Sequence, residues 1–213
     1  MRKLTLAVIM GAFMMSANTA SAQAMSEGNV AIDLYYGFPN LYTSVLRNAW
    51  ANSGSEENVK VGGIGPLGLR VEYMLADKVG LGADFGFNNS SVTYDYESSV
   101  WNAATSTYDP ITYTDEIKTT KIGFMVVFNY HFIDNDNLDF FGTVGAGYKN
   151  RSFKYSSTNP SFDDSGSGST TLIPIAARVG LGMRYFFTDN IGINLGVGFG
   201  QGGIANGGLS VKF

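Results

Sequence analysis

The sequence predicts an all-β protein, an eight-stranded antiparallel up-and-down transmembrane β-barrel. Two patterns support this prediction. Large apolar residues alternate with small or charged ones through most of the chain, and the segments that connect these stretches alternate between short and long. The composition agrees, because 27 glycines, 14% aromatic residues and only 15% charged residues suit a sheet that meets lipid on one face and a crowded interior on the other. A chain of 213 residues has room for one such domain.

The first 22 residues have the three parts of a secretory signal peptide. A basic start that includes Arg2 is followed by an apolar run over 4–17, and Ala20-Ser21-Ala22 then fits a cleavage site of small residues. A membrane anchor would need about 20 apolar residues, which is more than this run contains. We therefore predict a signal peptide at 1–22 and a barrel domain at 23–213.

Alternation with a period of two locates the strands. From Ile191 to Phe199 every second residue is large and apolar, and glycine or asparagine occupies the positions between them. A soluble sandwich also alternates, but it rarely sustains long strands with so many glycines on one face. The predicted strands lie near 29–38, 64–75, 79–97, 113–132, 138–155, 171–187, 191–200 and 206–213.

The connections and the register fit the same plan. Residues 76–78, 133–137 and 188–190 read as tight turns. The longer connections are rich in Ser, Thr, Asn and Tyr and cover 39–63, 98–112 and 156–170. Short periplasmic turns and long outer loops are typical of such barrels. Folding about the turns predicts four inward-facing pairs: Arg70 with Asp84, His131 with Asp139, Lys121 with Lys149, and Arg184 with Asn194.

The last strand ends in an aromatic residue. Leu209, Val211 and Phe213 face outward on it, in the pattern of the C-terminal signal by which outer-membrane barrels are recognised for assembly. With this ending and its strand pattern, the chain over 25–213 resembles the small outer-membrane barrel superfamily, which includes the barrel domain of outer-membrane protein A and outer-membrane proteins X and W. The resemblance implies a place in the bacterial outer membrane, contact with its lipid and lipopolysaccharide, and insertion by the barrel-assembly machinery.

Ten charged residues fall on inward positions of the predicted strands. They are Asp33, Glu72, Asp84 and Asp139 with Arg70, Lys121, Lys149, Arg151, Arg178 and Arg184. Because side chains fill an eight-stranded barrel, we expect a buried ion-pair network that keeps the lumen closed. The protein would then serve structural or surface-interaction roles through its extracellular loops. The alternative is a narrow channel for small solutes, which the resemblance to outer-membrane protein W implies.

An outer-leaflet enzyme is the weakest alternative. The known enzymatic barrels mostly use a histidine near the extracellular side, whereas His131, the one histidine of the chain, lies beside a periplasmic turn. Residues 198–203 match a dinucleotide fingerprint but lack the helix that must follow it. Residues 134–137 resemble a calcium loop but lack its glycine. No cofactor, metal or catalytic residue is predicted, and a net charge of −4 argues against nucleic acid.

The long connections are the places where an extracellular ligand would bind. Residues 39–52 fit a short amphipathic helix, with Leu41, Val45, Leu46 and Ala49 on one side, that caps the barrel mouth or rests on the leaflet. Residues 92–96 form a Tyr-rich ribbon above membrane height, a composition suited to binding a partner.

Overall fold

The computed structural model describes residues 24–50, 57–132, 135–162, 166–169, 171 and 173–213. Its elements are β1 (Val30–Phe38), α2 (Leu41–Trp50), β2 (Glu57–Ala76), β3 (Val79–Asn102), β4 (Thr107–His131), β5 (Leu138–Ser157), β6 (Ser167–Ser169), β7 (Ile175–Phe186), β8 (Ile191–Gly200) and β9 (Ala205–Lys212). All pairings among these strands are antiparallel. The all-β prediction is confirmed.

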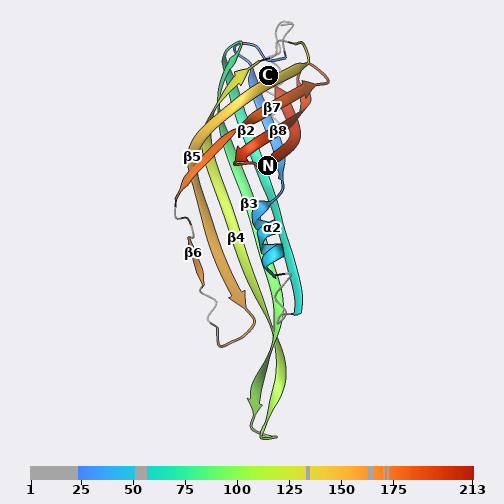
Figure 1. The fold of residues 1–213 in the computed structure, drawn as a ribbon, viewed down its shortest axis with the longest axis vertical. Helices are drawn as coiled ribbons and strands as arrows, with labels where there is room; N and C mark the ends of the chain where they lie inside the picture. The colour runs from blue at the N-terminus through green and yellow to red at the C-terminus, as the bar shows by residue number, and fades with distance from the viewer. Residues whose placement is uncertain (1–23, 51–56, 133–134, 163–165, 170, 172) are drawn as a thin grey trace, which may run out of the picture.

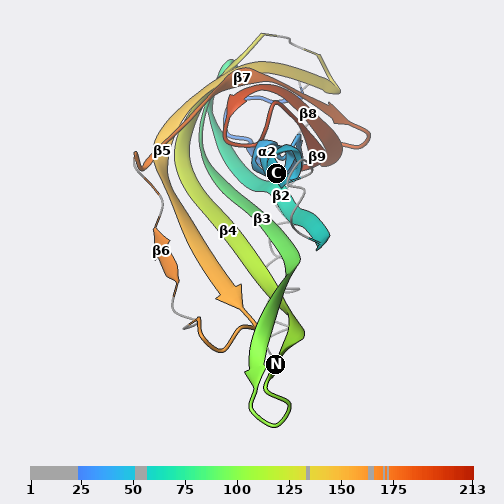
Figure 2. The ribbon, with the colours of Figure 1, turned by 60° about the horizontal axis from the view of Figure 1, so that its bottom comes forward.

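Eight of the described strands close into a ring. Each of them pairs with two neighbours, and the ring is completed where β1 pairs with β9 and where β4 pairs with β5. The three-residue β6 pairs only with β5 and lies outside the ring. Figure 2 shows the strands bent round into the ring, and Figure 1 shows the same strands from the side.

Apolar side chains cover the outside of the barrel. Along β4 and the residue after it, the outward face is apolar from Ile122 to Phe132, a stretch of 11 residues that matches the roughly 9–11 residues of a transmembrane strand. Aromatic rings gather at the end of this face nearest the β4–β5 turn, where the ring centroids of Tyr130 and Phe132 lie 5.4 Å apart. Tyr185 and Phe187 form a similar pair at 5.6 Å. Such rings mark the boundary between membrane and water.

The sheet continues far beyond this apolar band on the opposite side. β3 and β4 pair without interruption as far as Asn102 and Thr107, and they project from the barrel as a long hairpin (Figure 1). Our expectation of a loop over 98–112 was therefore wrong for all but the four residues at the tip. β-branched and aromatic residues in both arms favour strand over loop. β2 and β5 also extend along this hairpin, to Glu57 and Ser157.

The register agrees with two of the four predicted pairs. Arg70 faces Asp84 and Arg184 faces Asn194. The other two predictions were wrong by two residues, because His131 faces Phe141 and Lys121 faces Arg151. The first residues of β5 pair with β7, where Asp139 faces Arg184, and the pairing of β5 with β4 begins only at Phe141. The turn between β4 and β5 is therefore longer than we expected. A shift of two residues leaves every side chain on its predicted face.

The inward glycines make room for large neighbours. A Cβ atom on Gly182 would lie 2.3 Å from the ring of Phe141, and one on Gly68 would lie 2.0 Å from the ring of Tyr35. Each ring therefore lies over a glycine of the adjacent strand. This packing explains why the inner face alternates between very small and very large residues.

Candidate functional site

The centre of the lumen is filled by a group of ionised side chains around Arg184. This residue is completely buried on β7, and its guanidinium reaches carboxylates from three other strands. It donates to Asp33 at 2.8 Å, to Glu72 at 2.6 Å and to Asp139 at 2.9 Å. The planar guanidinium also lies over the ring of Phe141, 4.4 Å from its centroid. A planar five-donor group is suited to serve several carboxylates at once.

A second arginine, Arg70 on β2, adds Asp84 of β3 to this group. Arg70 donates to Asp84 through Nε at 3.2 Å and through Nη2 at 3.1 Å, and its Nη1 lies 3.6 Å from Asp33. The hydroxyl of Tyr35 donates to Asp84 at 2.7 Å, and the hydroxyl of Ser210 donates to Asp33 at 2.6 Å. These bonds satisfy carboxylates that would otherwise be costly to bury.

His131 joins the group at its periplasmic end. Its Nδ1 lies 2.5 Å from Asp139 and its Nε2 lies 3.0 Å from Glu72. Both ring nitrogens can donate to carboxylates only when the ring is an imidazolium. The side chain is 2% exposed, so His131 is an interior residue, and it contacts the Asp139 with which the sequence paired it. We call Asp33, Arg70, Glu72, Asp84, His131, Asp139 and Arg184 the closing network.

The structure divides the ten predicted lumen charges into two groups. Six belong to the closing network, whereas four basic residues lie nearer the extracellular mouth. Arg178 donates to the main-chain carbonyl of Gln201. Lys121, Lys149 and Arg151 share the inner face of β4 and β5. Among the described residues, no carboxylate forms an ion pair with Lys121, Lys149 or Arg178, so the two-signed network that we expected does not extend to these three.

A helix lies at the mouth, as residues 39–52 predicted. Figure 2 shows α2 beside the barrel opening. Polar contacts at the start of the helix fix it to the barrel, because Asn40 bonds to Asn88 at 2.9 Å and Thr43 to Ser90 at 2.7 Å. Tyr42 lies over the guanidinium of Arg151 at 4.6 Å. The apolar side is the outer one, since Leu41 and Val45 are more than half exposed. Among the described residues, no helix is long and apolar enough to cross a membrane.

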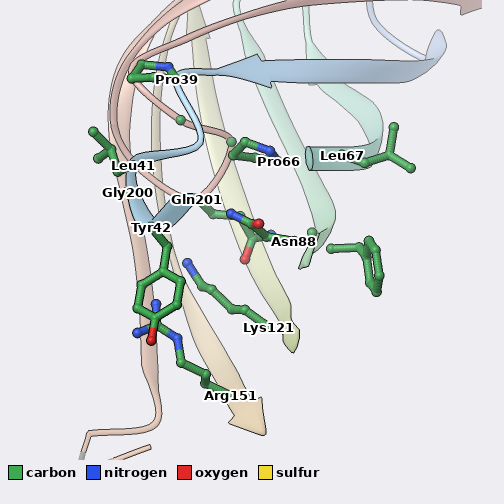
Figure 3. Close-up of a pocket in the computed structure, with 14 residues that line it drawn as sticks. Pro39, Leu41, Tyr42, Pro66, Leu67, Asn88, Lys121, Arg151, Gly200 and Gln201 are labelled. Carbon is green, nitrogen blue, oxygen red and sulfur yellow. The ribbon is translucent and has the colours of Figure 1, made fainter. Parts of the chain in front are cut away.

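A pocket of about 160 Å³ lies between α2 and the barrel wall (Figure 3). Lys121 and Arg151 form one wall together with Tyr42, and Leu41 and Pro66 form an apolar wall across from them. We call this space the mouth pocket. In the described part of the chain, no group of three or more His, Asp or Glu side chains could hold a metal ion.

The candidate site also contains residues that the sequence did not indicate. Tyr35, Asn129, Gln201 and Ser210 all bond to the closing network. Three of them occupy inward positions of strands, where the alternation gave the only available signal. Gln201 comes from the β8–β9 turn and folds back into the lumen, where its Nε2 donates to Asp84 at 2.9 Å. No strand pattern predicts such a turn residue.

A comparison with protein families identifies the class of this barrel. A family model described as the outer membrane protein beta-barrel domain matches residues 10–208. Among solved structures, the β-barrel domain of Pseudomonas aeruginosa OprF has 14% identity and a TM-score of 0.45, with 89% of this chain and 100% of that chain covered.

Two further structures have similar values. OprG from Pseudomonas aeruginosa has 13% identity and a TM-score of 0.43, with 91% of this chain and 99% of that chain covered. Ail, the attachment invasion locus protein of Yersinia pestis, has 14% identity and a TM-score of 0.42, with 88% and 99% covered, in a complex with the heparin analogue sucrose octasulfate. A comparison with curated proteins found no match. None of these similarities assigns a role to a residue of this chain.

Proposed function

Because the chain belongs to the family of outer membrane protein β-barrel domains, we propose that it is a non-conducting barrel that serves structural and surface-interaction roles. In this proposal the lumen stays closed while the hairpin of β3 and β4 and the other outer segments meet partners outside the cell. The runner-up function is a narrow channel for small solutes, and the two differ in whether the lumen conducts.

The closing network is the observation that supports a closed lumen. Its seven side chains come from six of the eight ring strands, and none of them is more than 4% exposed. An ion crossing at this level would have to displace Arg184 from three carboxylates. Separating a buried charge from its partners is costly in a low-dielectric interior, so the network opposes conduction.

Planar-bilayer conductance of the refolded mature protein tests the proposal. We expect a silent bilayer for the wild-type protein and for Arg178→Ala, which removes a cation that lies above the closing network. Flotation with lipid and a heat-modifiable band on a gel would show that the silent protein is inserted and folded. Discrete openings of the wild-type protein, altered by Arg178→Ala, would instead establish the channel.

The proposal includes no catalytic activity. Outer-leaflet chemistry that depends on histidine has no suitable group here, because both ring nitrogens of His131 are occupied by carboxylates deep in the lumen. We expect the wild-type protein to show no turnover in a lipid-modification assay. A measurable turnover that His131→Ala abolishes would overturn this view.

We also propose export through a cleaved signal peptide at 1–22 of a Gram-negative protein. Those residues lie outside the described part of the structure, so the support comes from their sequence. Mass spectrometry of the protein from outer membranes should find Gln23 as the first residue. A mature protein that retains its first 22 residues would contradict the proposed cleavage.

A further inference from the structure

Three cationic side chains meet at the extracellular end of the lumen. Lys121 and Arg151 lie directly opposite each other in the β4–β5 ladder. Lys149 lies two residues before Arg151 on β5 and on the same face. Like charges directly opposite each other destabilise a pair of strands. Among the residues that the structure describes, no carboxylate forms an ion pair with Lys121 or Lys149. The fold therefore concentrates positive charge here, and the described residues supply no carboxylate ion pair to Lys121 or Lys149.

The mouth pocket lies at this concentration of charge. Lys121 and Arg151 line it, and none of the described residues around it carries a carboxylate. Gln201 lines it as well, and although this side chain is only 5% exposed, its Oε1 has no hydrogen-bond partner. In Figure 3 the amine of Lys121 points toward Tyr42 and Gln201, into the space beneath α2. A positively charged pocket with one unpaired acceptor oxygen is suited to an anion that also carries a hydroxyl group, because the hydroxyl can donate to that oxygen.

The first turn of α2 adds to this preference. The helix begins at Leu41, which lines the pocket beside Tyr42. Asn40 caps the amide of Thr43, but the amides of Leu41 and Tyr42 have no acceptor within the helix. The N-terminal end of a helix carries partial positive charge and free N–H groups, and both favour anions. We propose that the mouth pocket binds a phosphate group, held by Lys121, Arg151 and the first amides of α2.

Phosphate fits these donors better than a singly charged anion does. It carries close to two negative charges at neutral pH and offers oxygens in several directions. The pocket presents two cations from the strands and N–H groups from a different element. Arginine also matches phosphate with two parallel hydrogen bonds. The phosphate would relieve the repulsion between Lys121 and Arg151, so binding and folding support each other.

The phosphate has two possible sources, a free molecule or a lipid headgroup. The apolar wall of the pocket includes Leu67, which is 37% exposed and lies on the lipid-facing side of β2. A lipid phosphate could place its acyl chains along this wall, whereas a free phosphate would use only the charged side. The chemistry that recognises the phosphate is the same in both cases.

The experiment compares two lysines of the same strand. Lys118 faces Lys154 on the outer side of the β4–β5 ladder, so Lys118→Gln removes the same charge from a like-charged pair outside the pocket. The refolded protein in maltoside micelles is titrated with inorganic phosphate by calorimetry, at constant ionic strength. We expect Lys121→Gln to weaken phosphate binding about tenfold or more, because it removes a charge-assisted hydrogen bond. Lys118→Gln should bind like the wild-type protein.

Thermal unfolding gives a second measurement. Phosphate should raise the unfolding temperature of the wild-type protein and of Lys118→Gln, but not that of Lys121→Gln. Without phosphate, Lys121→Gln should be at least as stable as the wild-type protein, because it removes the repulsion with Arg151. The proposal would be overturned if the wild-type protein bound no phosphate in lipid-free or lipid-doped micelles. It would also be overturned if Lys121→Gln and Lys118→Gln lost phosphate binding equally.

Micelles doped with short-chain phosphatidic acid distinguish the two sources, with the diacylglycerol of the same chains as the control. Competition by phosphatidic acid at lower concentrations than inorganic phosphate, absent with Lys121→Gln, would identify a lipid headgroup. Binding of inorganic phosphate without such competition would identify the free anion. Both results support the phosphate site, and the conductance measurement tests the closed lumen separately.

Discussion

The stability of the folded barrel depends on single residues in its lumen, and Arg184 is the clearest case. Its guanidinium is completely buried and contacts Asp33, Glu72 and Asp139, so it neutralises carboxylates from three strands. Buried ion pairs contribute little when they are compared with apolar packing, but removing one partner leaves the others uncompensated. The consequence of losing Arg184 should therefore be much larger than the net contribution of the network.

Arg184→Met tests this asymmetry. The variant keeps an unbranched side chain but leaves three buried carboxylates without their arginine, so we expect a loss of about 3–5 kcal/mol in the free energy of unfolding. Urea unfolding in lipid vesicles measures the change. The exposed Arg47 of α2 provides the control, since Arg47→Met should be close to neutral. Similar stabilities for the two variants would show that the network does not hold the barrel together.

The inward glycines make a second prediction at this scale. A methyl group on Gly182 would meet the ring of Phe141, so Gly182→Ala should cost about 1–3 kcal/mol by overpacking. Gly168 of β6 has nothing within 4 Å of the same position, and Gly168→Ala serves as the control. The same urea assay compares them. Equal effects would mean that the lumen can adjust around an added methyl group.

At the scale of elements, the projecting hairpin and the barrel below it are stabilised separately. Above the apolar band and beyond Tyr96 and Tyr113, whose rings lie 5.8 Å apart, β3 and β4 pair only with each other among the described strands. The tip adds an exposed edge-to-face pair, Trp101 and Tyr108, with centroids 5.2 Å apart. Nothing in the closing network depends on this part of the chain.

Shortening the hairpin should therefore leave the barrel intact. Replacing 97–112 by Asn-Gly joins Tyr96 to Tyr113 through a two-residue turn that suits paired strands. We expect the urea unfolding of this variant to match the wild-type protein within about 0.5 kcal/mol. Binding to an extracellular partner, if it uses the tip, should be lost. Failure of the shortened protein to fold would show that the tip takes part in barrel formation.

The junction of β2 with the hairpin should respond to pH. Hydrogen bonds from Thr114 at 2.7 Å and Asn58 at 3.0 Å lower the pKa of the Asp95 carboxyl, which lies outside the membrane band. A lowered pKa in the folded state means that the bonds stabilise the junction above the ordinary aspartate pKa and are lost as pH falls through the lowered value. Acid should therefore lower the protection factors against amide exchange at the end of β2. An Asp95→Asn variant whose exchange depends on pH in the same way would contradict this assignment.

The sequence predicts the strands of this barrel better than it predicts the contacts between them. Alternation predicts the strands and their faces, because its period is set by strand geometry. It does not predict the β4–β5 register, since a shift of two residues leaves each of Lys121 and His131 facing inward. Nor does it show that Arg184 on β7 reaches Asp33 on β1, with β8 and β9 between them. That contact depends on the tilt of the whole ring.

At the scale of the whole molecule, the final residues join the two ends of the barrel. The amide of Phe213 donates to Val30, and the amide of Val30 donates to Phe213, both at 2.9 Å. Leu209, on the same strand, is 60% exposed toward the outside. Phe213 thus completes the seam between β1 and β9, in addition to its predicted role with Leu209 and Val211 as an assembly signal.

Phe213→Ala should separate assembly from stability. If Phe213 is part of the assembly signal, the variant should reach the outer membrane of cells in severalfold lower amount while refolding in detergent much like the wild-type protein. Heat-modifiable mobility measures both. Phe199→Ala removes another outward aromatic side chain, 73% exposed on β8, and should have little effect on assembly. Equal losses for the two variants would point to lipid contact in general rather than to recognition of the end of the chain.

The seam between β1 and β9 also sets the order of events during biogenesis. Ala31 pairs with Lys212, so these partners are about as far apart in sequence as the ring allows. Contacts of such long range form slowly, because a long loop must close before they contribute. Until β9 arrives, β1 has one unpaired edge that lipid cannot satisfy. The chain therefore has to remain outside the bilayer, or have that edge shielded by another protein, until its last strand has been exported.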